Sequence, residues 1–365
     1  MSNPVRIGVI GASEFTANMH LSCLASDPQT QIAAICARSR TNTEALAARF
    51  NIPEIYQDYR EMFARAKLDA VLVSIPDDLH YPVVMAALDA GLHVLCEKPL
   101  ASTAAQALEM TEKAAAAGRV NCTYFTFRWF PHFRYLKELF EQQAIGRVFH
   151  AQIRYLFDYA RNPAYAWRFD PARAGGVVAD LGAHAFDQAR WYFGEITSVF
   201  ANLHSIHPHY WPDGRPVAPS NDLAHVELRF ASGMSADITL TAGAVMSDKN
   251  YEIQILALGD GGTLEVAQSM QGSDENHIVT PLEMRISRAG QDHFENLHLP
   301  ANYCPSSDPA NAYSVFTNCD AGARAFTSAI RRGQPATPSF EDGYQAQRVI
   351  DAAIRSHQSG GWENV

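Results

Sequence analysis

The side chains best suited to chemistry follow the ends of predicted strands. Glu97 and Lys98 come directly after the apolar run 92–96, and Pro99 follows them. A residue before proline is restricted toward an extended backbone, so we expect Lys98 to point out of the sheet instead of entering a helix. An exposed Glu–Lys pair at a strand end is the commoner alternative. Open α/β sheets bind ligands at the carboxyl ends of their strands, so Lys98 is a candidate site residue.

A second candidate group has an acid and a histidine four residues apart. Asp180 and His184 lie on one face if the segment after the pair Gly175-Gly176 is helical. A carboxylate beside an imidazole can fix the tautomer of the ring and adjust its pKa for general acid or base work. A satisfied His–Asp pair in a capped core helix explains the spacing equally well. No third ligand has a spacing typical of a metal site, so we predict no metal.

A glycine turn follows the first predicted strand. Gly8 and Gly11 fall where a dinucleotide-binding fold needs backbone amides close to a pyrophosphate, at the start of a helix. Ser13 and Thr16 replace the later glycines of a GxGxxG pattern, and a hydroxyl there can still admit a phosphate and add a donor. By itself the turn is weak evidence, because an ordinary tight turn has the same composition. Its place at the start of a strand–helix series favours nucleotide binding.

The end of the second predicted strand bears on which nucleotide binds. A carboxylate there typically binds the ribose 2′-hydroxyl of NAD, whereas a 2′-phosphate needs cations and no acid. Residues 36–40 contain Arg38, Ser39 and Arg40 and no acid. Arg38 could stack on adenine and pair with phosphate, although two solvated arginines on a loop are the alternative. We predict NADP(H) as the preferred cofactor, with NAD(H) as the second option.

These groups require a parallel sheet in the first third of the chain. Short apolar strands alternate there with helical segments, which is typical of a sheet covered on both faces. We expect strands at 5–10, 31–37, 69–74, 93–96 and 120–125. Helices are expected up to residue 24 and at 43–50, 81–90 and 103–117, with Thr41 or Asn42 capping the second.

After Pro131 the segments become longer and alternate between apolar and polar residues. This pattern is typical of an antiparallel sheet with one exposed face. We expect strands at 148–157, 199–204, 224–230, 234–241, 251–258 and 262–266, and helices at 132–142, 318–332 and 343–358. We therefore predict an α/β domain at 1–125 and an α+β domain with a large open, mostly antiparallel sheet at 126–365. The C-terminal helices could pack back on the first domain.

Composition excludes several classes of protein. The chain has 365 residues, 47% of them apolar, which is enough for two globular domains. A formal net charge of −10 argues against nucleic acid and anionic membranes as partners. We expect no signal peptide and no membrane-spanning segment. Six scattered cysteines without a CxxC pair predict buried free thiols and a cytoplasmic location, namely Cys23, Cys36, Cys96, Cys122, Cys304 and Cys319.

Two further features have plain structural interpretations. His204, His207 and His209 resemble a metal cluster, but they leave a strand into a loop with proline and glycine, so we predict a solvated loop. The aromatic run 124–131 predicts core packing. Arg128 is the exception within that run, because a charge there could face a pocket.

Taken together, these motifs resemble the glucose–fructose oxidoreductase, inositol dehydrogenase and MocA family of NAD(P)-dependent oxidoreductases. The resemblance extends over essentially the full length. It rests on the glycine turn, on Glu97-Lys98-Pro99, on Arg128 with Pro131, on Gly146, on Trp167-Arg168, on Gly175-Gly176 ahead of Asp180 and His184, and on the late turn 259–265. Ser13, Thr16, Asp77 and Val177 depart from the usual family pattern, and none of these departures removes a catalytic group.

The resemblance implies a Rossmann domain followed by an open sheet domain, with substrate held in the cleft between them. It implies that Lys98 reaches the reacting oxygen, that His184 is the acid or base, and that Asp180 is its partner or a substrate ligand. Whether Lys98 or His184 is the true base stays open, as does the role of Glu97 in binding ribose or holding the lysine. The implied cofactor residues are Gly8, Gly11, Ser13, Glu14, Phe15, Arg38, Ser39, Ser74, Ile75, Pro76, His80, Glu97 and Lys98. The implied substrate residues are Arg128, Tyr155, Trp167, Arg168, Asp180 and His184.

These expectations define an oxidoreductase that transfers hydride to or from a secondary hydroxyl or ketone of a sugar, cyclic polyol or related carbohydrate. One alternative is a glycosidase that holds NAD(P) and oxidises its substrate transiently. Another is a cofactor-binding regulator without catalysis. The partners expected are a small carbohydrate-like substrate and a second copy of the chain, in a homodimer or homotetramer.

Overall fold

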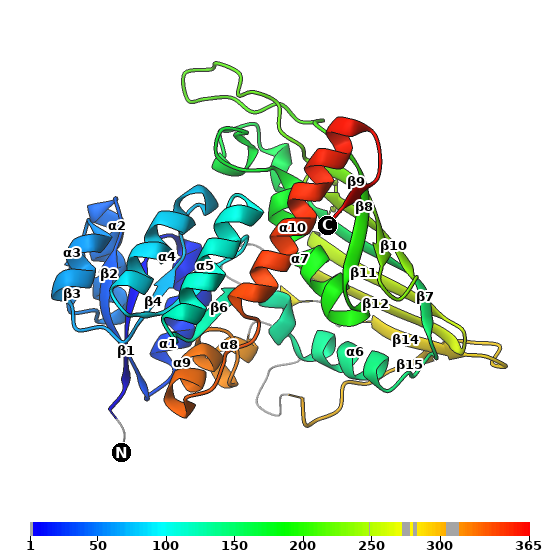
Figure 1. Ribbon diagram of the computed structural model, residues 1–365, viewed down its shortest axis with the longest axis horizontal. Coiled ribbons are helices and arrows are strands. Elements are labelled where there is room, and N and C mark those ends of the chain that lie inside the picture. The colour runs from blue at the N-terminus through cyan, green and yellow to red at the C-terminus, as the bar shows by residue number, and fades with distance from the viewer. Residues whose placement is uncertain (1–2, 248, 272–277, 280–282, 304–313) are drawn as a thin grey trace. The chain divides into compact units, whose positions relative to one another are not determined.

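The chain forms two compact units in the computed structural model, which describes residues 3–247, 249–271, 278–279, 283–303 and 314–365 (Figure 1). The first unit contains Met1–Trp129 and Tyr313–Gln345, and the second contains Phe130–Ala312 and Ala346–Val365. The chain therefore returns to the first unit before its end. It leaves that unit again within helix α10 (Phe340–Ser359).

The first unit is built on a six-stranded parallel sheet with the strand order β3-β2-β1-β4-β5-β6. The strands are β1 (Val5–Ile10), β2 (Thr30–Cys36), β3 (Glu54–Tyr56), β4 (Ala70–Val73), β5 (His93–Glu97) and β6 (Asn121–Tyr124). Every residue of β4 is buried, as a continuous apolar run between two layers of helices requires. This strand order defines a doubly wound Rossmann-type sheet and confirms the predicted fold class.

Helices cover both faces of this sheet (Figure 1). They are η1 (Thr16–Leu21, a π-helix), α1 (Ser22–Ala25), α2 (Arg40–Phe50), α3 (Tyr59–Arg65), η2 (Asp77–Leu79), α4 (His80–Asp89), α5 (Ala104–Ala116), η3 (Thr126–Trp129), α8 (Ser314–Asn318) and α9 (Ala323–Arg332). The predicted caps of α2 were wrong, since the side chain of Ser39 accepts the N–H of Asn42. Strand β3 and helix α3 were not predicted, because three strand residues are too few to show a period.

The register of the parallel sheet aligns the residues that matter for binding. Ile10 pairs with Val73, and Val73 pairs with Cys96. The next residue along each strand therefore falls at one edge, and these residues are Gly11, Ser74 and Glu97. The candidate cofactor residues of the first unit are thus brought to the carboxyl edge by strand pairing alone.

The second unit is built on a ten-stranded sheet, in which only β7 and β10 pair in parallel among the strands that the structure describes. Its strands are β7 (Val148–Phe157), β8 (Ile196–His204), β9 (Leu223–Phe230), β10 (Ser235–Thr241), β11 (Lys249–Gly259), β12 (Gly262–Gln271), β13 (Ile278–Val279), β14 (Glu283–Arg288), β15 (Glu295–Asn296) and β16 (Glu363–Asn364). The predicted open, mostly antiparallel sheet is therefore confirmed. Strands β13 to β16 were not predicted, three of them having only two residues.

One face of this sheet is covered and the other is open (Figure 1). Helices α6 (Pro131–Glu141) and α7 (Val177–Phe193), with the later part of α10, lie on the covered face. Short helices η4 (Tyr159–Arg161) and η5 (Trp167–Phe169) precede α7. Along β9 buried and outward residues alternate strictly from Ala224 to Phe230, as the period-two pattern predicted.

Most side chains of the aromatic run and four of the cysteines are buried. Side chains of the run pack in the core, with Tyr124, Phe125 and Phe130 at most 1% exposed. Cys23, Cys36, Cys96 and Cys122 are buried free thiols. The expectation was wrong for Cys319, which is disulfide-bonded, while Cys304 lies outside the described residues. Among the described residues, no helix is both long and apolar enough to cross a membrane.

A buried histidine makes the stability of the second unit depend on pH. His132 is 5% exposed, and its Nε2 lies 2.8 Å from Oε1 of Gln268, whose amide donates to the hydroxyl of Tyr251. Burial lowers the pKa of His132 to about 4. The unfolded chain takes up a proton near pH 6.5, whereas the folded chain does so only near pH 4, so stability falls as the pH drops through this window.

We expect the free energy of unfolding to fall by about 2 kcal/mol between pH 7 and pH 5 through His132 alone. Urea titrations followed by tryptophan fluorescence at both pH values measure the change. His132→Asn should lose this part of the pH dependence, although it is less stable at pH 7. The exposed His225 is the matched control, and His225→Asn should keep the full pH dependence. An unchanged pH dependence in His132→Asn would contradict the expectation.

Candidate functional site

The glycine turn after β1 approaches the end of β4 so closely that only glycine fits. Gly11 has a φ of +123°, and a Cβ at this position would lie 2.0 Å from the carbonyl oxygen of Ser74. The N–H of Gly11 donates to the carbonyl of Cys36 over 2.9 Å, which ties the turn to β2 as well. Such a turn leaves the backbone open for close approach of a pyrophosphate, which is what a dinucleotide fold requires.

Hydrogen bonds between hydroxyl groups stabilise this turn, at positions where glycines are more usual. The Oγ of Ser13 accepts the N–H of Thr16 over 3.1 Å and lies 2.9 Å from its hydroxyl. The hydroxyl of Thr16 in turn lies 3.1 Å from the Oγ of Ser74. Thr16 is fully buried. The three hydroxyls therefore support the turn from within, and the phosphate contact predicted for Ser13 stays a prediction.

The remaining residues of the turn and of the second strand end are exposed. The side chain of Glu14 is 77% exposed and forms an ion pair of 3.4 Å with Arg49, and Phe15 is 48% exposed. Arg38 is exposed after β2. Its neighbour Arg40 pairs with Glu44 on α2 at 2.7 Å. Arg38, more than Arg40, is therefore the cation available for a nucleotide phosphate.

Lys98 leaves the end of β5 beside a buried carboxylate. Glu97 is 7% exposed, and its Oε1 lies 2.8 Å from Nε2 of His20 in η1. The other oxygen of Glu97 accepts the backbone N–H of Lys98 over 3.2 Å. Lys98 itself is half-buried, and its peptide bond to Pro99 is cis. Lys98 thus stands at the edge that also carries Gly11 and Ser74.

His80 connects the ends of two neighbouring strands. Its Nδ1 lies 2.9 Å from the carbonyl oxygen of Pro99, and its Nε2 lies 2.9 Å from that of Ile75. The ring is almost fully buried. His80 therefore holds the backbone after β4 against the backbone after β5, and the cofactor contacts predicted for His80, Ile75 and Pro76 stay predictions.

Helix α7 carries Asp180 and His184, and the segment before β9 fixes its start. The carbonyl of Asn221 accepts the N–H of Val177 over 2.8 Å, and its Oδ1 accepts that of Val178 over 2.9 Å. A Cβ on Gly176 would lie 2.5 Å from this carbonyl oxygen, so glycine is required there. Asn221 therefore satisfies two backbone donors at the N-terminus of α7.

Asp180 lies among polar and aromatic side chains of the second unit. Its Oδ2 accepts the hydroxyl of Tyr159 over 2.5 Å and lies 3.3 Å from Nε of Arg168. The guanidinium of Arg168 lies 4.5 Å from the ring centre of Trp167. Burial and the charge of Asp180 raise the pKa of Tyr159 well above its usual value, so its hydroxyl stays protonated. The structure thus brings together Asp180, Arg168 and Trp167, and adds Tyr159.

His184 follows Asp180 by one turn of α7 and is 7% exposed. Helical spacing places the two residues on one face, as predicted. Tyr155 is fully buried instead, with its hydroxyl bonded to Gln188 on α7. The period of β7 turns Tyr155 toward the helix layer, so its predicted contact with substrate stays a prediction and Tyr159 is the better candidate.

Arg128 forms a buried ion pair within the first unit. Its guanidinium lies 3.0 Å from Oδ1 of Asp342 in α10, and the two side chains are 8% and 18% exposed. The other oxygen of Asp342 accepts the N–H of Ser339 over 2.8 Å. This pair connects the chain after β6 to the start of α10. The substrate contact predicted for Arg128 stays a prediction.

The predicted solvated histidine loop was wrong for His209, while the side chain of His207 is 30% exposed. His209 is 7% exposed and stacks on Phe169 with ring centres 4.5 Å apart. His207 lies 3.0 Å from Asp222, which is 1% exposed and also accepts the N–H of Ile206. His209 therefore anchors this loop on η5, while most of its other residues are exposed. Among the described residues no group of three or more histidine, cysteine or acidic side chains could hold a metal ion.

The buried free thiols in the part of the chain that the structure describes are poor nucleophiles. Burial raises the pKa of Cys23 to about 11 and that of Cys36 to about 12. Burial also raises the pKa of Cys96 well above its usual value. These thiols stay protonated at neutral pH, so covalent catalysis by them is not expected.

The strand order of the first unit and its glycine turn at Gly11 are those of a dinucleotide-binding fold. The glycine cradle at Gly11, the exposed Arg38 and the half-buried Lys98 all belong to one carboxyl edge of a doubly wound sheet. The pattern of the oxidoreductase family with an NAD-binding Rossmann fold matches residues 5–125, and that of the family's C-terminal α/β domain matches residues 137–365. The chain belongs to this family, the glucose–fructose oxidoreductase, inositol dehydrogenase and MocA family. The predicted class, an NAD(P)-dependent dehydrogenase or reductase, is confirmed.

Individual relatives match over most of their length. Levoglucosan dehydrogenase of Pseudarthrobacter phenanthrenivorans is 26% identical over 93% of this chain and 90% of its own. D-xylose 1-dehydrogenase (NADP⁺) 2 of Haloferax volcanii is 34% identical over 90% of each chain. A solved structure of levoglucosan dehydrogenase in complex with NADH and levoglucosan has a TM-score of 0.85 and 26% identity, covering 100% of both chains.

Proposed function

We propose that this protein is an NADP(H)-dependent oxidoreductase that transfers hydride to or from a secondary hydroxyl or ketone of a sugar, cyclic polyol or related carbohydrate. The observation that carries the proposal is the carboxylate of Asp180 on α7, which is hydrogen-bonded to Tyr159 and ion-paired with Arg168. A carboxylate with fixed partners is suited to bind hydroxyl groups, and Trp167 offers an aromatic face to the apolar side of a sugar ring. Relatives named for levoglucosan and D-xylose support this substrate class.

The residues divide the chemistry between them. Bound nicotinamide supplies the acceptor or donor of the hydride. When an alcohol is oxidised, its hydroxyl proton must leave, and either Lys98 or His184 takes it as general base. The ammonium of Lys98 would otherwise stabilise negative charge on the reacting oxygen. Asp180 orients the substrate hydroxyls, and Tyr159 and Arg168 keep its carboxylate in place.

A substrate screen tests the proposal directly. Sugars, cyclic polyols and ketosugars are offered with each nicotinamide cofactor, and absorbance of the reduced nicotinamide reports hydride transfer. Turnover with net change in cofactor supports the proposal. Hydrolysis of a glycoside without net change would indicate instead a glycosidase that oxidises its substrate transiently. Cofactor binding without turnover of any compound would indicate a regulator.

The preference for NADP(H) depends on Arg38. We expect Arg38→Ala to raise the dissociation constant of NADPH roughly 10- to 100-fold, because a charge-assisted bond to the 2′-phosphate is lost, and to raise that of NADH much less, since only stacking on adenine is lost there. Quenching of protein fluorescence measures both constants. Arg40→Ala is the matched control on the same loop, and it should change neither constant because Arg40 already pairs with Glu44. Tighter binding of NADH than of NADPH by the wild type would refute the preference.

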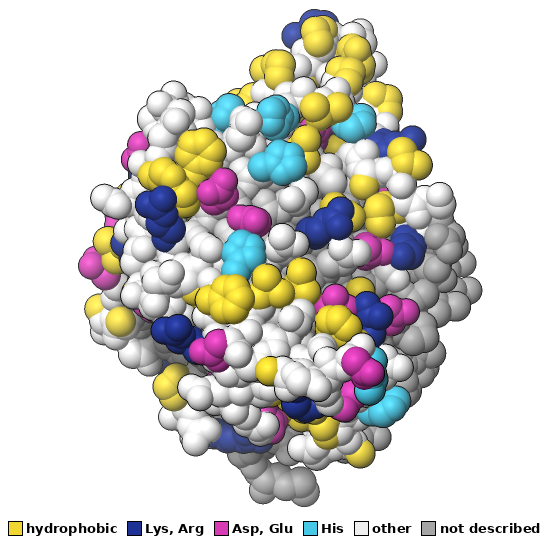
Figure 2. Space-filling model, turned by 90° about the vertical axis from the view of Figure 1, so that its right-hand side faces the viewer, with side chains coloured by type: hydrophobic (Ala, Val, Ile, Leu, Met, Phe, Trp, Pro, Cys, Tyr) yellow, Lys and Arg dark blue, Asp and Glu magenta, His cyan; other side chains and the backbone are white. Residues whose placement is uncertain are grey.

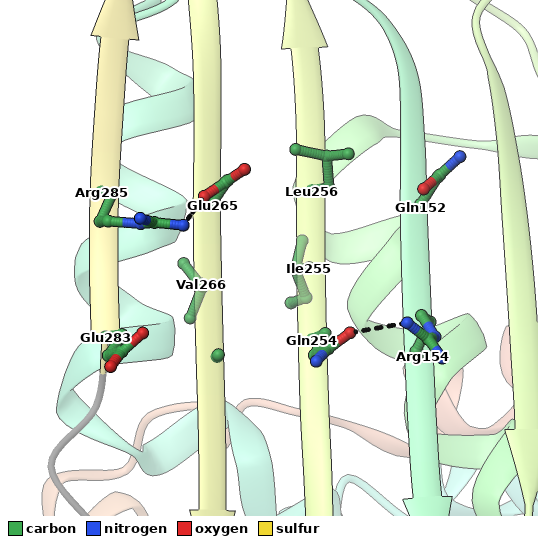
Figure 3. Close-up of a pocket in the computed structure, with 10 residues that line it drawn as sticks. Gln152, Arg154, Gln254, Ile255, Leu256, Glu265, Val266, Glu283 and Arg285 are labelled. Atoms are coloured by element: carbon green, nitrogen blue, oxygen red, sulfur yellow. Dashed lines mark hydrogen bonds and ion pairs between the residues drawn. The ribbon is translucent and has the colours of Figure 1, made fainter. Parts of the chain in front are cut away.

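We also propose that the open face of the large sheet binds a second copy of the chain. Figure 2 shows charged side chains of both signs and hydrophobic side chains interspersed on the side of the molecule where this face lies. A depression of about 380 Å³ lies over β7, β11, β12 and β14 (Figure 3). Arg285 pairs there with Glu265 at 2.6 Å, and Arg154 donates to Gln254 over 3.1 Å. A surface with both signs of charge can pair with itself across a twofold axis.

Leu256 tests this interface because it lies between Gln152 and Glu265 in the sheet register. We expect Leu256→Asp to convert the oligomer into a monomer, since an extra carboxylate on each copy would meet its symmetry mate in a desolvated contact. Sedimentation velocity gives the mass. Ile55→Asp is the control, because Ile55 is 41% exposed on β3 in the first unit. A monomeric wild type, or an oligomer that survives Leu256→Asp, would contradict the proposal.

We further propose the cytoplasm as the compartment of the protein. Four buried free thiols support it, and the disulfide at Cys319 is the observation that opposes it. Fractionation of the source cells with an antibody to the protein tests the assignment, and recovery outside the cytoplasmic fraction would refute it.

A further inference from the structure

A buried histidine contacts the carboxylate that adjoins Lys98. His20 is fully buried, its Nε2 lies 2.8 Å from Oε1 of Glu97, and the two side chains are 0% and 9% exposed. Its other ring nitrogen, Nδ1, has no hydrogen-bond partner and is buried. A carboxylate accepts hydrogen bonds, so Nε2 is the nitrogen that donates. Among the residues that the structure describes, the hydrogen bond to Glu97 is therefore the single polar contact of the His20 ring.

The backbone around His20 brings the ring to this place. His20 lies in η1, which is a π-helix, and such wide turns often occur at functional sites. Edge-to-face contacts hold the ring between Tyr124, at 4.4 Å, and Phe15, at 5.7 Å between centres. Tyr124 pairs with Glu97 in the register of β5 and β6. The ring is therefore held from three sides, by the glycine turn, by β6 and by Glu97.

Glu97 transmits this position to Lys98. One oxygen of Glu97 is bound by His20 and the other accepts the backbone N–H of Lys98 over 3.2 Å. The carboxylate thus bridges the imidazole and the first backbone group of the residue that we place at the reacting oxygen. We propose that His20 is a positioning residue, which fixes through Glu97 the direction in which Lys98 leaves β5. This inference rests on the proposed role of Lys98 in catalysis.

The proposal gives Glu97 a defined task. A buried carboxylate is costly unless it is hydrogen-bonded, and both of its oxygens are used within the first unit. Losing the histidine would leave Oε1 without that donor, and Glu97 would rotate toward another one. The N–H of Lys98 would then lose its acceptor. An error of about 1 Å in the position of a reacting group can cost roughly 100-fold in rate.

His20→Leu and His20→Gln test the proposal as a pair. Leucine fills the apolar space without a donor, whereas the amide of glutamine can still donate to Glu97. We expect His20→Leu to lower kcat roughly 10- to 100-fold, with KM and the dissociation constant of NADPH changed less than threefold. His20→Gln should recover most of kcat. Equal losses in both variants, or a loss confined to cofactor binding, would overturn the proposal.

A second measurement does not depend on turnover. Chemical labelling of lysine amines in the cofactor-free protein, read by mass spectrometry, gives the reactivity of Lys98. We expect this reactivity to change in His20→Leu and to be normal in His20→Gln. His93→Gln is the matched control, since His93 lies at the opposite end of β5 and accepts the N–H of Val120. Unchanged labelling of Lys98 in His20→Leu would overturn the proposal even if that variant were inactive.

The two hypotheses fail in distinguishable ways. If Lys98→Met is fully active, the catalytic role of the lysine is wrong, whatever His20 does. If Lys98→Met is inactive while His20→Leu keeps its kcat and its Lys98 labelling, only the positioning role is wrong. Glu97→Gln adds a check that does not rely on folding of the leucine variant. Its effect should not add to that of His20→Leu when both are combined, because both act through one contact.

Discussion

Lys98→Met is expected to lower the rate of hydride transfer roughly 100- to 1,000-fold. Methionine keeps most of the length and apolar volume of the lysine stem, so the variant removes chiefly the ammonium group. Lys98 is half-buried at the carboxyl edge of the sheet, where a charge acts more strongly than it would in water. Single-turnover measurements of nicotinamide absorbance at saturating substrate give the rate without contribution from product release.

Lys113 provides the matched control for this variant. It belongs to α5 in the same unit and pairs with Asp89 at 2.6 Å, away from the carboxyl ends of the strands. Lys113→Met should transfer hydride at the wild-type rate. A rate for Lys98→Met within threefold of the wild type would exclude the lysine from the chemistry.

The pH dependence of the rate separates the two candidate bases. Oxidation of an alcohol requires the base in its deprotonated form, so the rate falls on the acidic side of the pKa of that base. If His184 is the base, His184→Asn removes this acidic limb and Lys98→Met retains it. If Lys98 is the base, the outcome is reversed.

Gly11→Ala is expected to lower the stability of the first unit by about 3–5 kcal/mol and to raise the dissociation constant of NADPH at least tenfold. The added Cβ would lie 2.0 Å from the carbonyl oxygen of Ser74, and the φ of +123° is one that L-residues rarely adopt. The end of β4 must therefore move away from β1. This displacement would also separate the hydroxyl of Ser74 from that of Thr16.

Gly118 separates the clash from the effect of φ alone. Its φ is +60°, and nothing lies within 4 Å of the position that a Cβ would take. Gly118→Ala should cost about 1 kcal/mol and leave cofactor binding unchanged. Thermal unfolding and NADPH titration of both variants make the comparison. If the two glycines responded alike, the close approach at Gly11 would have no energetic importance.

Much of the fold follows from patterns that lie within a few residues. Continuous apolar runs predicted the inner strands of the parallel sheet, and alternation predicted the long strands of the second sheet. Strand β3 escaped because Glu54–Tyr56 is short and Ile55 is exposed at the edge. The N-cap of α2, Ser39, was not predicted because Thr41 and Asn42 are equally good caps by residue type.

The site of the first unit was predictable because a Rossmann sheet repeats the same geometry. Strand ends near Gly11, Ser74 and Glu97 must meet at one edge once the strands are parallel. His20 had no such signal, since its importance comes from a contact with Glu97 across 77 residues of sequence. Periodicity within one segment carries no information about such a contact.

The site of the second unit was predictable only in part. The i, i+4 spacing found Asp180 and His184, but Tyr159, which donates to Asp180, lies in the short helix η4 after β7 and has no distinctive neighbours in the sequence. The role of Asn221 was not predicted either, because its hydrogen bonds to the start of α7 are long-range in sequence. Val177 lies 44 residues before it and Val178 lies 43 residues before it. Tyr155 was assigned to the substrate by resemblance, and the inward phase of β7 places it in the core.

The buried pair of Arg128 and Asp342 bears on when the first unit can finish folding during synthesis. Arg128 belongs to the segment that closes the parallel sheet, yet its carboxylate comes 214 residues later, in α10. A fragment that ends after η3 would leave this arginine without Asp342, and it would also lack α8 and α9. On the ribosome, the nucleotide-binding unit can therefore be completed only when nearly the whole polypeptide has emerged, although most of its residues are translated first.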